Sequence, residues 1–192
     1  MPFPDELDPR GVTVHSYRDT WPTEATELAR DLATLVPTAR AVEHIGSTAI
    51  PGMAAKDCLD MMIIVADLDA SGAEPALTAA GYRLRPEPWN TSEEAGGRTW
   101  PKQVFAPPSG ARPSNIHVRT TNSASTRLAL LFRDHLRADP QRTRWWSELK
   151  LAAAKHTTSL ADYGELKYPA WHLLMELAEV WADETGWTPL LP

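Results

Sequence analysis

A short stretch in the first third of the chain carries the side chains best suited to phosphate and metal chemistry. Gly46 and Ser47 form a turn in which glycine lets the backbone approach a ligand closely. The amides of such a turn and the hydroxyls of Ser47 and Thr48 can hold phosphate oxygens, and Lys56 follows in the same loop. Asp60 then lies in an apolar run that indicates a buried strand, where an uncompensated carboxylate costs several kcal/mol. A metal ion would compensate that charge, so the stretch predicts a phosphate site beside a metal ligand.

Two histidines, His44 and His117, are candidates for catalysis at this site. Residues 114–119 alternate between apolar and polar side chains, which predicts a strand with Asn115 and His117 on one face. His117 could ligate a metal or act as a general base, because histidine titrates near neutral pH. The alternative is a hydrogen-bonded strand histidine. His44, beside the Gly-Ser turn, is as well explained by an orienting hydrogen bond as by catalysis.

Cationic side chains gather in the second half of an otherwise acidic chain. Between positions 127 and 150 there are six cationic residues against three anionic ones, in a protein of net charge −6. Arg133 and Arg137 are one turn apart on a predicted helix and share a face. The arginine fork suits phosphate oxygens, so this region could clamp a triphosphate. A solvated helical face is the alternative.

The elements that must position these groups follow from hydrophobic periodicity and turn residues. An apolar stripe of period 3.6 predicts a helix over 22–36, and helical spacing returns from residue 123 to the end, interrupted at Asp139-Pro140 and opened again at Ser159. The remaining elements are short: strands at 12–14, 82–85 and 102–106, a helix that ends before Gly81, and a mobile loop over 86–100 rich in proline and glycine.

Composition excludes several function classes. The net charge of −6 argues against bulk attraction to nucleic acid or anionic membranes. No apolar run approaches the length of a transmembrane helix, and the first residues lack a signal-peptide pattern. A single cysteine, Cys58, excludes an intramolecular disulfide framework, so a cytoplasmic location is expected. The oligomeric state is left open.

One continuous string of the chain resembles the hallmark of a known family. It reads Glu-His-Ile-Gly-Ser-Thr at 43–48, Pro-Gly at 51–52, Ala-Ala-Lys at 54–56 and Leu-Asp at 59–60. This string is similar to that of the GrpB-like family, a branch of the nucleotidyltransferase superfamily related to DNA polymerase beta. The resemblance implies an α+β fold, with a small mixed β-sheet and flanking helices in residues 1–120 and a C-terminal helical region, 121–192, packed on it.

Further strings extend the resemblance along the chain. Asn-x-His-Val at 115–118 and Phe-Arg-Asp-x-Leu-Arg at 132–137 are similar to family motifs, as are Lys150 and the Tyr-x-x-x-Lys pair of Tyr163 and Lys167. The resemblance implies that Tyr163 and Lys167 contact the base and phosphates of a nucleotide. Three of the five lysines in the chain lie at such positions, namely Lys56, Lys150 and Lys167.

The chain departs from the superfamily at its metal site. Residues 60 and 62 of a strand point the same way, and the second metal-binding carboxylate of the superfamily would fall on Met62. The third carboxylate belongs on the strand that here carries Asn115 and His117. The resemblance therefore implies a metal site formed by Asp60 with His117 or Asn115 in place of a carboxylate.

The resemblance implies an enzyme that depends on Mg²⁺ and on ATP or another nucleoside triphosphate. Asp60, His117 and His44 are the expected catalytic residues, and the nucleotide-binding residues are expected to be Gly46, Ser47, Thr48, Lys56, Arg133, Arg137, Lys150, Tyr163 and Lys167. A small-molecule acceptor would receive a nucleotidyl group, or a carboxylate would be activated as an adenylate and captured by an amine. The alternative is a catalytically reduced nucleotide-binding module with a regulatory or accessory role related to coenzyme A.

Overall fold

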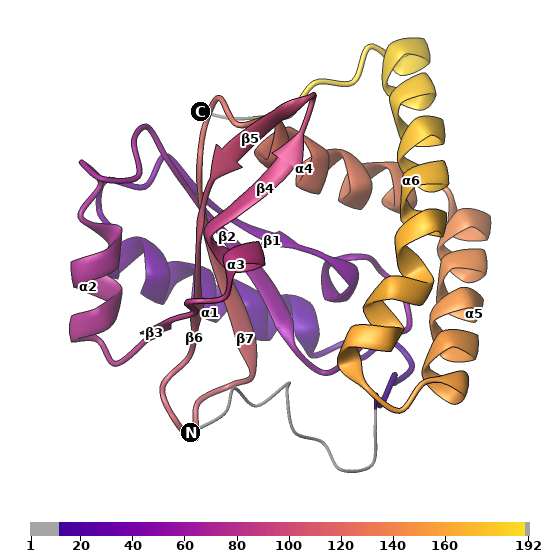
Figure 1. Ribbon diagram of the computed structural model, residues 1–192, viewed down its shortest axis with the longest axis horizontal. Helices are drawn as coiled ribbons and strands as arrows, with labels where there is room; N and C mark the ends of the chain where they lie inside the picture. Colours follow the sequence, from indigo (N-terminus) through magenta and orange to yellow (C-terminus); the bar gives the residue numbers. More distant parts are fainter. Residues whose placement is uncertain (1–11, 191–192) are drawn as a thin grey trace.

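A five-stranded mixed sheet lies at the centre of the protein, in a computed structural model that describes residues 12–190 (Figure 1). The strand order is β1-β2-β7-β6-β3; β2 and β7 run parallel, and the other neighbours are antiparallel. A separate antiparallel pair, β4-β5, forms a hairpin. The strands are β1 (Ala41–Ile45), β2 (Leu59–Val65), β3 (Arg83–Leu84), β4 (Ser92–Ala95), β5 (Arg98–Pro101), β6 (Gln103–Ala106) and β7 (Ser114–Thr120).

Helices cover both faces of the sheet and form the C-terminal part of the described chain. They are α1 (Trp21–Leu35), α2 (Ala73–Ala79), α3 (Pro88–Thr91), α4 (Ala124–Arg137), α5 (Pro140–His156) and α6 (Leu160–Thr185), with a 3-10 turn, η1 (Ser47–Ala49), after β1. The expected α+β architecture is therefore confirmed. Within residues 12–190, no helix is both long and apolar enough to cross a membrane.

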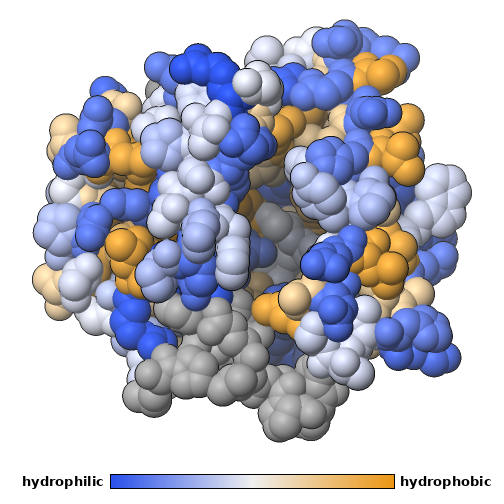
Figure 2. All heavy atoms as spheres, viewed as in Figure 1, coloured by the Kyte–Doolittle hydropathy of each residue, from blue (hydrophilic) through white to orange (hydrophobic). Residues whose placement is uncertain are grey.

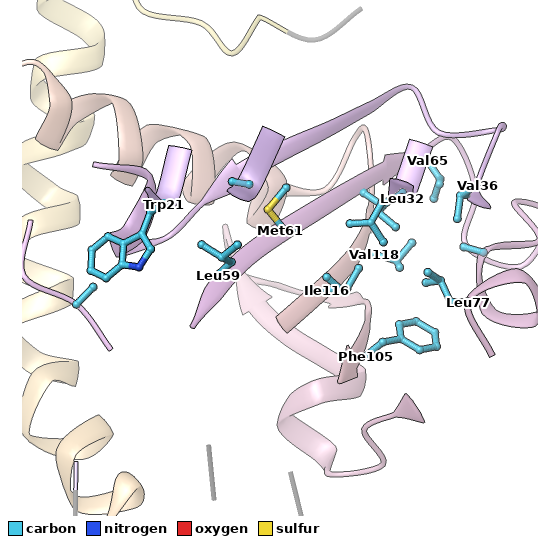
Figure 3. Close-up of a cluster of buried hydrophobic side chains, with 14 residues drawn as sticks. Trp21, Leu32, Val36, Leu59, Met61, Val65, Leu77, Phe105, Ile116 and Val118 are labelled. Atoms are coloured by element: carbon cyan, nitrogen blue, oxygen red, sulfur yellow. The ribbon is translucent and has the colours of Figure 1, made fainter. Parts of the chain in front are cut away.

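The main core lies between the sheet and the first two helices (Figure 3). Every second residue of β2 points into it, because strand side chains alternate between faces. The helices contribute Trp21 and Leu32 of α1 and Leu77 of α2, which pack against the sheet in this core. The buried residues of the sheet on this side are Leu59, Met61, Ile63, Val65, Phe105, Ile116 and Val118.

The opposite face of β2 carries Asp60 and Met62, as the strand periodicity predicted. Met62 and Ile64 are fully buried against Ile45 of β1 and Leu130 of α4. Asp60 lies two residues nearer the start of the strand, and its side chain keeps 32% of its exposure. This face of β2 is therefore closed at Met62 and Ile64 and accessible at Asp60.

Side-chain caps fix where the C-terminal helices begin. Ser123, Asp139 and Ser159 each accept hydrogen bonds from backbone amides in the first turns of α4, α5 and α6. The cap and break predicted at Asp139-Pro140 are confirmed. Helix α4 packs on β1 and β7, and α5 and α6 pack on α4, so the helical region is attached to the sheet through α4. The division of the chain near residue 120 stays a prediction.

Two local predictions were wrong. Residues 86–100, expected as a mobile loop, contain α3, β4 and most of β5, and Gly96 and Gly97 form the hairpin turn at positive φ. Residues 12–14 form no strand; the adjacent His15 makes only an isolated bridge to Ala55.

Candidate functional site

The Gly-Ser turn is held directly against the Asp60 carboxylate. Strand β1 ends at Ile45, which is the antiparallel register partner of Asp60. Gly46 follows at φ 67°, a conformation that side-chain-bearing residues rarely adopt. A Cβ at this position would overlap Asp60 Oδ2 and lie 3.0 Å from Asp60 Cβ. The predicted juxtaposition of Gly46 and Asp60 is present, and only glycine satisfies both the backbone and the contact.

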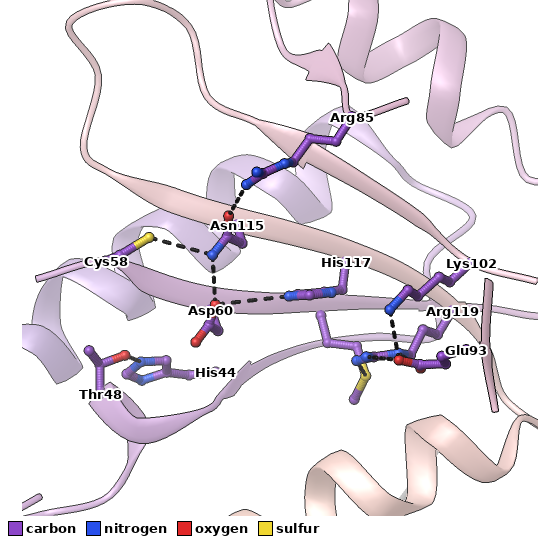
Figure 4. Close-up of polar contacts among 11 residues, drawn as sticks. His44, Thr48, Cys58, Asp60, Arg85, Glu93, Lys102, Asn115, His117 and Arg119 are labelled. Carbon is purple, nitrogen blue, oxygen red and sulfur yellow. Dashed lines mark hydrogen bonds and ion pairs between the residues drawn. The ribbon is translucent and has the colours of Figure 1, made fainter. Parts of the chain in front are cut away.

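Neighbours on β7 orient the Asp60 carboxylate (Figure 4). Asn115 Nδ2 donates to Asp60 Oδ1 at 3.0 Å, and His117 Nε2 lies 3.9 Å from the same oxygen. Arg85 Nη1 donates to Asn115 Oδ1 at 3.2 Å, which fixes the amide with its oxygen turned away from Asp60. Asn115 therefore orients Asp60 in this arrangement. Its role as a metal ligand stays a prediction that requires the amide to rotate.

The local environment sets the charges of this pair. Burial favours the neutral form of Asp60, but hydrogen bonding by His117 and Asn115 and the charge of Lys56 outweigh it and hold its pKa below the usual value. Burial lowers the pKa of His117. At neutral pH the site thus combines a carboxylate with a neutral imidazole. The Nδ1 atom of His117 is buried without a hydrogen-bond partner among the described residues.

One cavity gathers most of the residues predicted to bind a nucleotide. We call it the lysine cavity; its volume is about 220 Å³. Asp60 and Asn115 contribute from the sheet, and the rest come from the turn after β1, the loop before β2, and helices α5 and α6. Its lining residues are Ser47, Thr48, Ala55, Lys56, Cys58, Asp60, Asn115, Lys150, Tyr163 and Lys167.

Three ammonium groups face a single carboxylate in the lysine cavity. Lys150 is 3% exposed and donates to Ala54 O, and burial together with the charges of nearby lysines lowers its pKa to about 7. Burial and the charge of Lys56 lower the pKa of Lys167 to about 8. Lys167 Nζ lies 4.2 Å from the ring centroid of Tyr163, whose pKa burial raises to about 12. The cavity therefore holds more positive charge than the protein neutralises.

The other predicted residues support the turn from behind. His44 Nε2 lies 2.8 Å from Thr48 Oγ1, and burial lowers the pKa of His44 to about 4, so the ring is neutral. Arg133 bonds to Glu43 at 2.6 Å and to His44 O at 3.1 Å. Arg137 donates through Nε and Nη2 to Ala49 O, at 2.9 and 2.7 Å. Neither arginine lines the lysine cavity, so their action on phosphate stays a prediction that requires exchange of partners.

A second cavity, of about 360 Å³, lies on the other side of Asp60. We call it the hairpin cavity, because the β4-β5 hairpin forms one wall and α4 and α6 form the other. Figure 2 shows a cleft between the hairpin and α6 with apolar atoms at its base. The lining residues are Ile45, Gly46, Asp60, Glu93, Glu94, Ala95, His117, Arg119, Ser125, Leu128, Ala129, Phe132 and Trp171.

The hairpin brings in Glu93, a residue that sequence reasoning missed. Arg119 donates to Glu93 through Nε at 2.7 Å and through Nη2 at 3.0 Å, and Lys102 Nζ donates at 2.8 Å. These cations outweigh burial and lower the pKa of Glu93 to about 2. Arg119 Nη1 lies 3.4 Å from the sulfur of Met62. The Gly-Gly pair between two short polar strands was the signal that could have revealed the hairpin.

Comparison with known proteins identifies the family. The family model described as GrpB protein matches residues 11–176. A dephospho-CoA kinase of Mycolicibacterium paratuberculosis is 32% identical over 213 residues, covering 98% of this chain and 52% of that protein. The UPF0157 protein YqkA of Bacillus subtilis is 33% identical over 158 residues, covering 80% of this chain and 43% of YqkA. The chain thus spans about half the length of these relatives.

Solved structures show the same fold. The conserved protein GrpB from Enterococcus faecalis superposes with a TM-score of 0.70 at 24% identity, covering 88% of this chain and 99% of that one. The Cid1 poly(U) polymerase in its MgGTP-bound form superposes with a TM-score of 0.51 at 15% identity, covering 80% of this chain and 50% of that one. The chain belongs to the GrpB protein family and has a nucleotidyltransferase-like fold.

Proposed function

We propose that this protein is an enzyme that binds a magnesium–nucleoside triphosphate, ATP or a related nucleotide, and uses it to activate a small-molecule acceptor. The observation that carries the proposal is the lysine cavity. Three ammonium groups and the Ser47-Thr48 turn converge from four parts of the chain on a space with one carboxylate. A polyphosphate supplies the negative charge that such a cavity lacks. The MgGTP-bound Cid1 structure shares the fold and gives the same expectation of a nucleotide.

Asp60 fits a role in holding Mg²⁺. The partners of its carboxylate on β7 approach Oδ1, while Oδ2 lies against Gly46, and Asp60 itself lines the lysine cavity. Mg²⁺ commonly takes one or two carboxylates and completes its shell with substrate phosphates and water, so a single aspartate can suffice. Among residues 12–190 no group of three or more histidine, cysteine, aspartate or glutamate side chains could hold a metal without such help. Bound there, Mg²⁺ would neutralise charge on the transferring phosphate.

The chain's own groups cover the remaining tasks. Lys56, Lys150 and Lys167 neutralise the phosphates, and Asn115 keeps the Asp60 carboxylate in a fixed orientation. His117 is neutral and lines the hairpin cavity, so its ring can accept a proton from an acceptor bound there. The acceptor would receive the nucleotidyl group, or would be a carboxylate that is activated as an adenylate and passed to an amine.

Met62 and Arg119 favour a second candidate, a nucleotide-binding module without catalysis. A methionine and the guanidinium against its sulfur occupy the place next to Asp60 on the same face. A relative described as a dephospho-CoA kinase is about twice the length of this chain, which suits an accessory role beside coenzyme A chemistry.

Phosphorus NMR of ATP incubated with Mg²⁺, the protein and a panel of amines and carboxylic acids separates the two candidates. An enzyme releases pyrophosphate with AMP or a nucleotidyl product, and Asp60→Asn abolishes that release while leaving the fold intact. Binding of ATP without any turnover by the native protein would support the module. Turnover that survives Asp60→Asn within a few-fold would overturn the role of Asp60.

A further inference from the structure

The hairpin cavity has two chemically different walls. Its sheet and hairpin side carries Asp60, Glu93, Glu94, His117 and Arg119, whereas its helical side is apolar apart from Ser125. The apolar residues come from α4 and α6 and include two aromatic rings, in the set Leu128, Ala129, Phe132 and Trp171. A volume of about 360 Å³ is within the range of small-molecule sites. The ligand that fits such walls has one polar end and one apolar body.

The cation that lines this cavity is already neutralised. Arg119 is 6% exposed, gives two hydrogen bonds to Glu93, and directs its remaining Nη1 toward Met62. Lys102 binds the same Glu93 carboxylate from behind and does not line the cavity. A carboxylate ligand would therefore have to displace Glu93 from a buried, bidentate pair, which is unfavourable because it leaves the Glu93 charge without its partner.

Negative charge in the cavity is less well compensated. Glu94 accepts a hydrogen bond from the neutral hydroxyl of Thr99 and has no cationic partner among the described residues. Asp60 adds a second carboxylate, and its neighbours on β7, Asn115 and His117, are both neutral. A cationic head group would offset this charge, and aromatic rings on the facing wall favour a cation over an anion.

We infer that the hairpin cavity binds a small primary amine with an apolar body, and that this amine is the acceptor. The acceptor role rests on the proposed function. It is argued from the position of Asp60, which lines both cavities. The ammonium end lies toward Asp60, His117 and Glu94, and the apolar body lies against α4 and α6. An amine held there is next to the phosphates proposed for the lysine cavity. Its ammonium would lose one proton to His117 and a second to solvent, and its nitrogen would bond to the α-phosphorus as the bond to pyrophosphate breaks, or to the carbonyl carbon of an adenylate as AMP leaves.

The test uses the whole protein and three probes that differ only at the polar end: 2-phenylethylamine, 2-phenylethanol and 3-phenylpropionate. Ligand-observed NMR titration without nucleotide gives their dissociation constants. We expect the amine to bind about tenfold more tightly than the alcohol and the carboxylate to bind weakest. Equal affinity of the three probes, or preference for the carboxylate, would overturn the inference.

Two variants locate the site. Glu94→Gln removes one charge from an exposed hairpin residue and should weaken the amine about fivefold without changing the alcohol. Glu165→Gln, an exposed acid at the start of α6 outside the cavity, is the matched control and should change neither. Loss of amine affinity in the control alone would place the amine elsewhere.

The outcome is distinguishable from a failure of the proposed function. Calorimetry measures MgATP binding separately, and phosphorus NMR measures whether the amine stimulates ATP turnover. An amine that binds to a protein without affinity for MgATP would overturn its role as an acceptor and the proposed enzyme. A protein that binds MgATP but none of the amine would overturn the inference alone.

Discussion

Replacing Lys150 with methionine should make the protein more stable and a poorer nucleotide binder. The substitution keeps the length of the side chain and removes a charge that is 97% buried, since the residue is only 3% exposed. Burial and the nearby lysines lower the pKa of Lys150 from 10.5 to about 7, so its charge is disfavoured in the folded state. A residue kept at such a cost without a carboxylate partner points to a ligand that supplies the counter-charge.

The magnitude follows from the pKa. At about 1.4 kcal/mol for each tenfold change in proton affinity, the buried amine costs on the order of 4 kcal/mol at pH 7. Replacing Lys150 removes this cost, but loss of the hydrogen bond to Ala54 O lowers the stability of the variant by about 1–2 kcal/mol. A net stabilisation of about 2–3 kcal/mol should raise the melting temperature by roughly 5–10 °C. The sign can be checked with pH, because between pH 7 and 10 the unfolded chain binds the proton that folded Lys150 has lost. The unsubstituted protein should therefore gain more stability than the variant as pH rises, since Lys167 contributes the same trend to both.

Thermal melting and calorimetry with Mg²⁺ and a non-hydrolysable ATP analogue measure both effects. We expect the Lys150→Met variant to bind the analogue about 10–100-fold more weakly, because a charge-assisted contact is lost. Lys155→Met, on the exposed side of the same helix, is the control and should leave both quantities nearly unchanged. Unchanged nucleotide affinity in the Lys150→Met variant, or lower stability, would refute the reasoning.

Three other predictions concern the turn, the lysines and the metal. Gly46→Ala should lower the free energy of unfolding in urea by about 2–3 kcal/mol and weaken nucleotide binding, because its Cβ would overlap Asp60. Gly52→Ala, also at positive φ but with no atom within 4 Å of its Cβ, should lower it by only about 1 kcal/mol, and equal losses would mean that the overlap with Asp60 is unimportant. Because a polyanion favours the charged forms of Lys150 and Lys167, the protein should take up about one proton when it binds the ATP analogue at pH 8 and close to none at pH 6. Calorimetry in buffers of different ionisation enthalpy measures this uptake, and uptake that does not increase with pH would contradict the lysine assignment. In the Met62→Asp variant the new carboxylate should pair with Arg119, so Mg²⁺ should raise the melting temperature little over EDTA. The double variant Met62→Asp, Arg119→Met should have a melting temperature that depends on Mg²⁺, and no dependence would mean that residue 62 does not face a metal site.

The sequence alone was sufficient to locate the turn, strand β2 and the face of that strand that carries Asp60 and Met62. These features depend on local periodicity and on a glycine followed by two hydroxyl residues, both of which are visible without tertiary contacts. The convergence of Lys56, Lys150 and Lys167 on one cavity was expected only from the family resemblance, because nothing in the helical pattern shows that Lys150 is buried.

The hairpin gives a weaker signal in the sequence, because only the Gly-Gly pair at 96–97 marks its turn. Strands β4 and β5 have four residues each and lie outside the main sheet, so they lack the long apolar alternation that identifies β2 and β7. Their place over Asp60 depends on a tertiary ion pair between Glu93 and Arg119. The partners of Arg133 are likewise set by packing, since Glu43 is 90 residues away in sequence.

A crystal structure of the protein with Mg²⁺ and a non-hydrolysable ATP analogue tests the central claim most directly. We expect the phosphates to lie in the lysine cavity, within hydrogen-bond distance of Ser47 and of the ammonium groups of Lys56, Lys150 and Lys167, with Mg²⁺ bound to Asp60. Phosphates bound elsewhere, or a lysine cavity that excludes the analogue at millimolar concentration, would contradict the account.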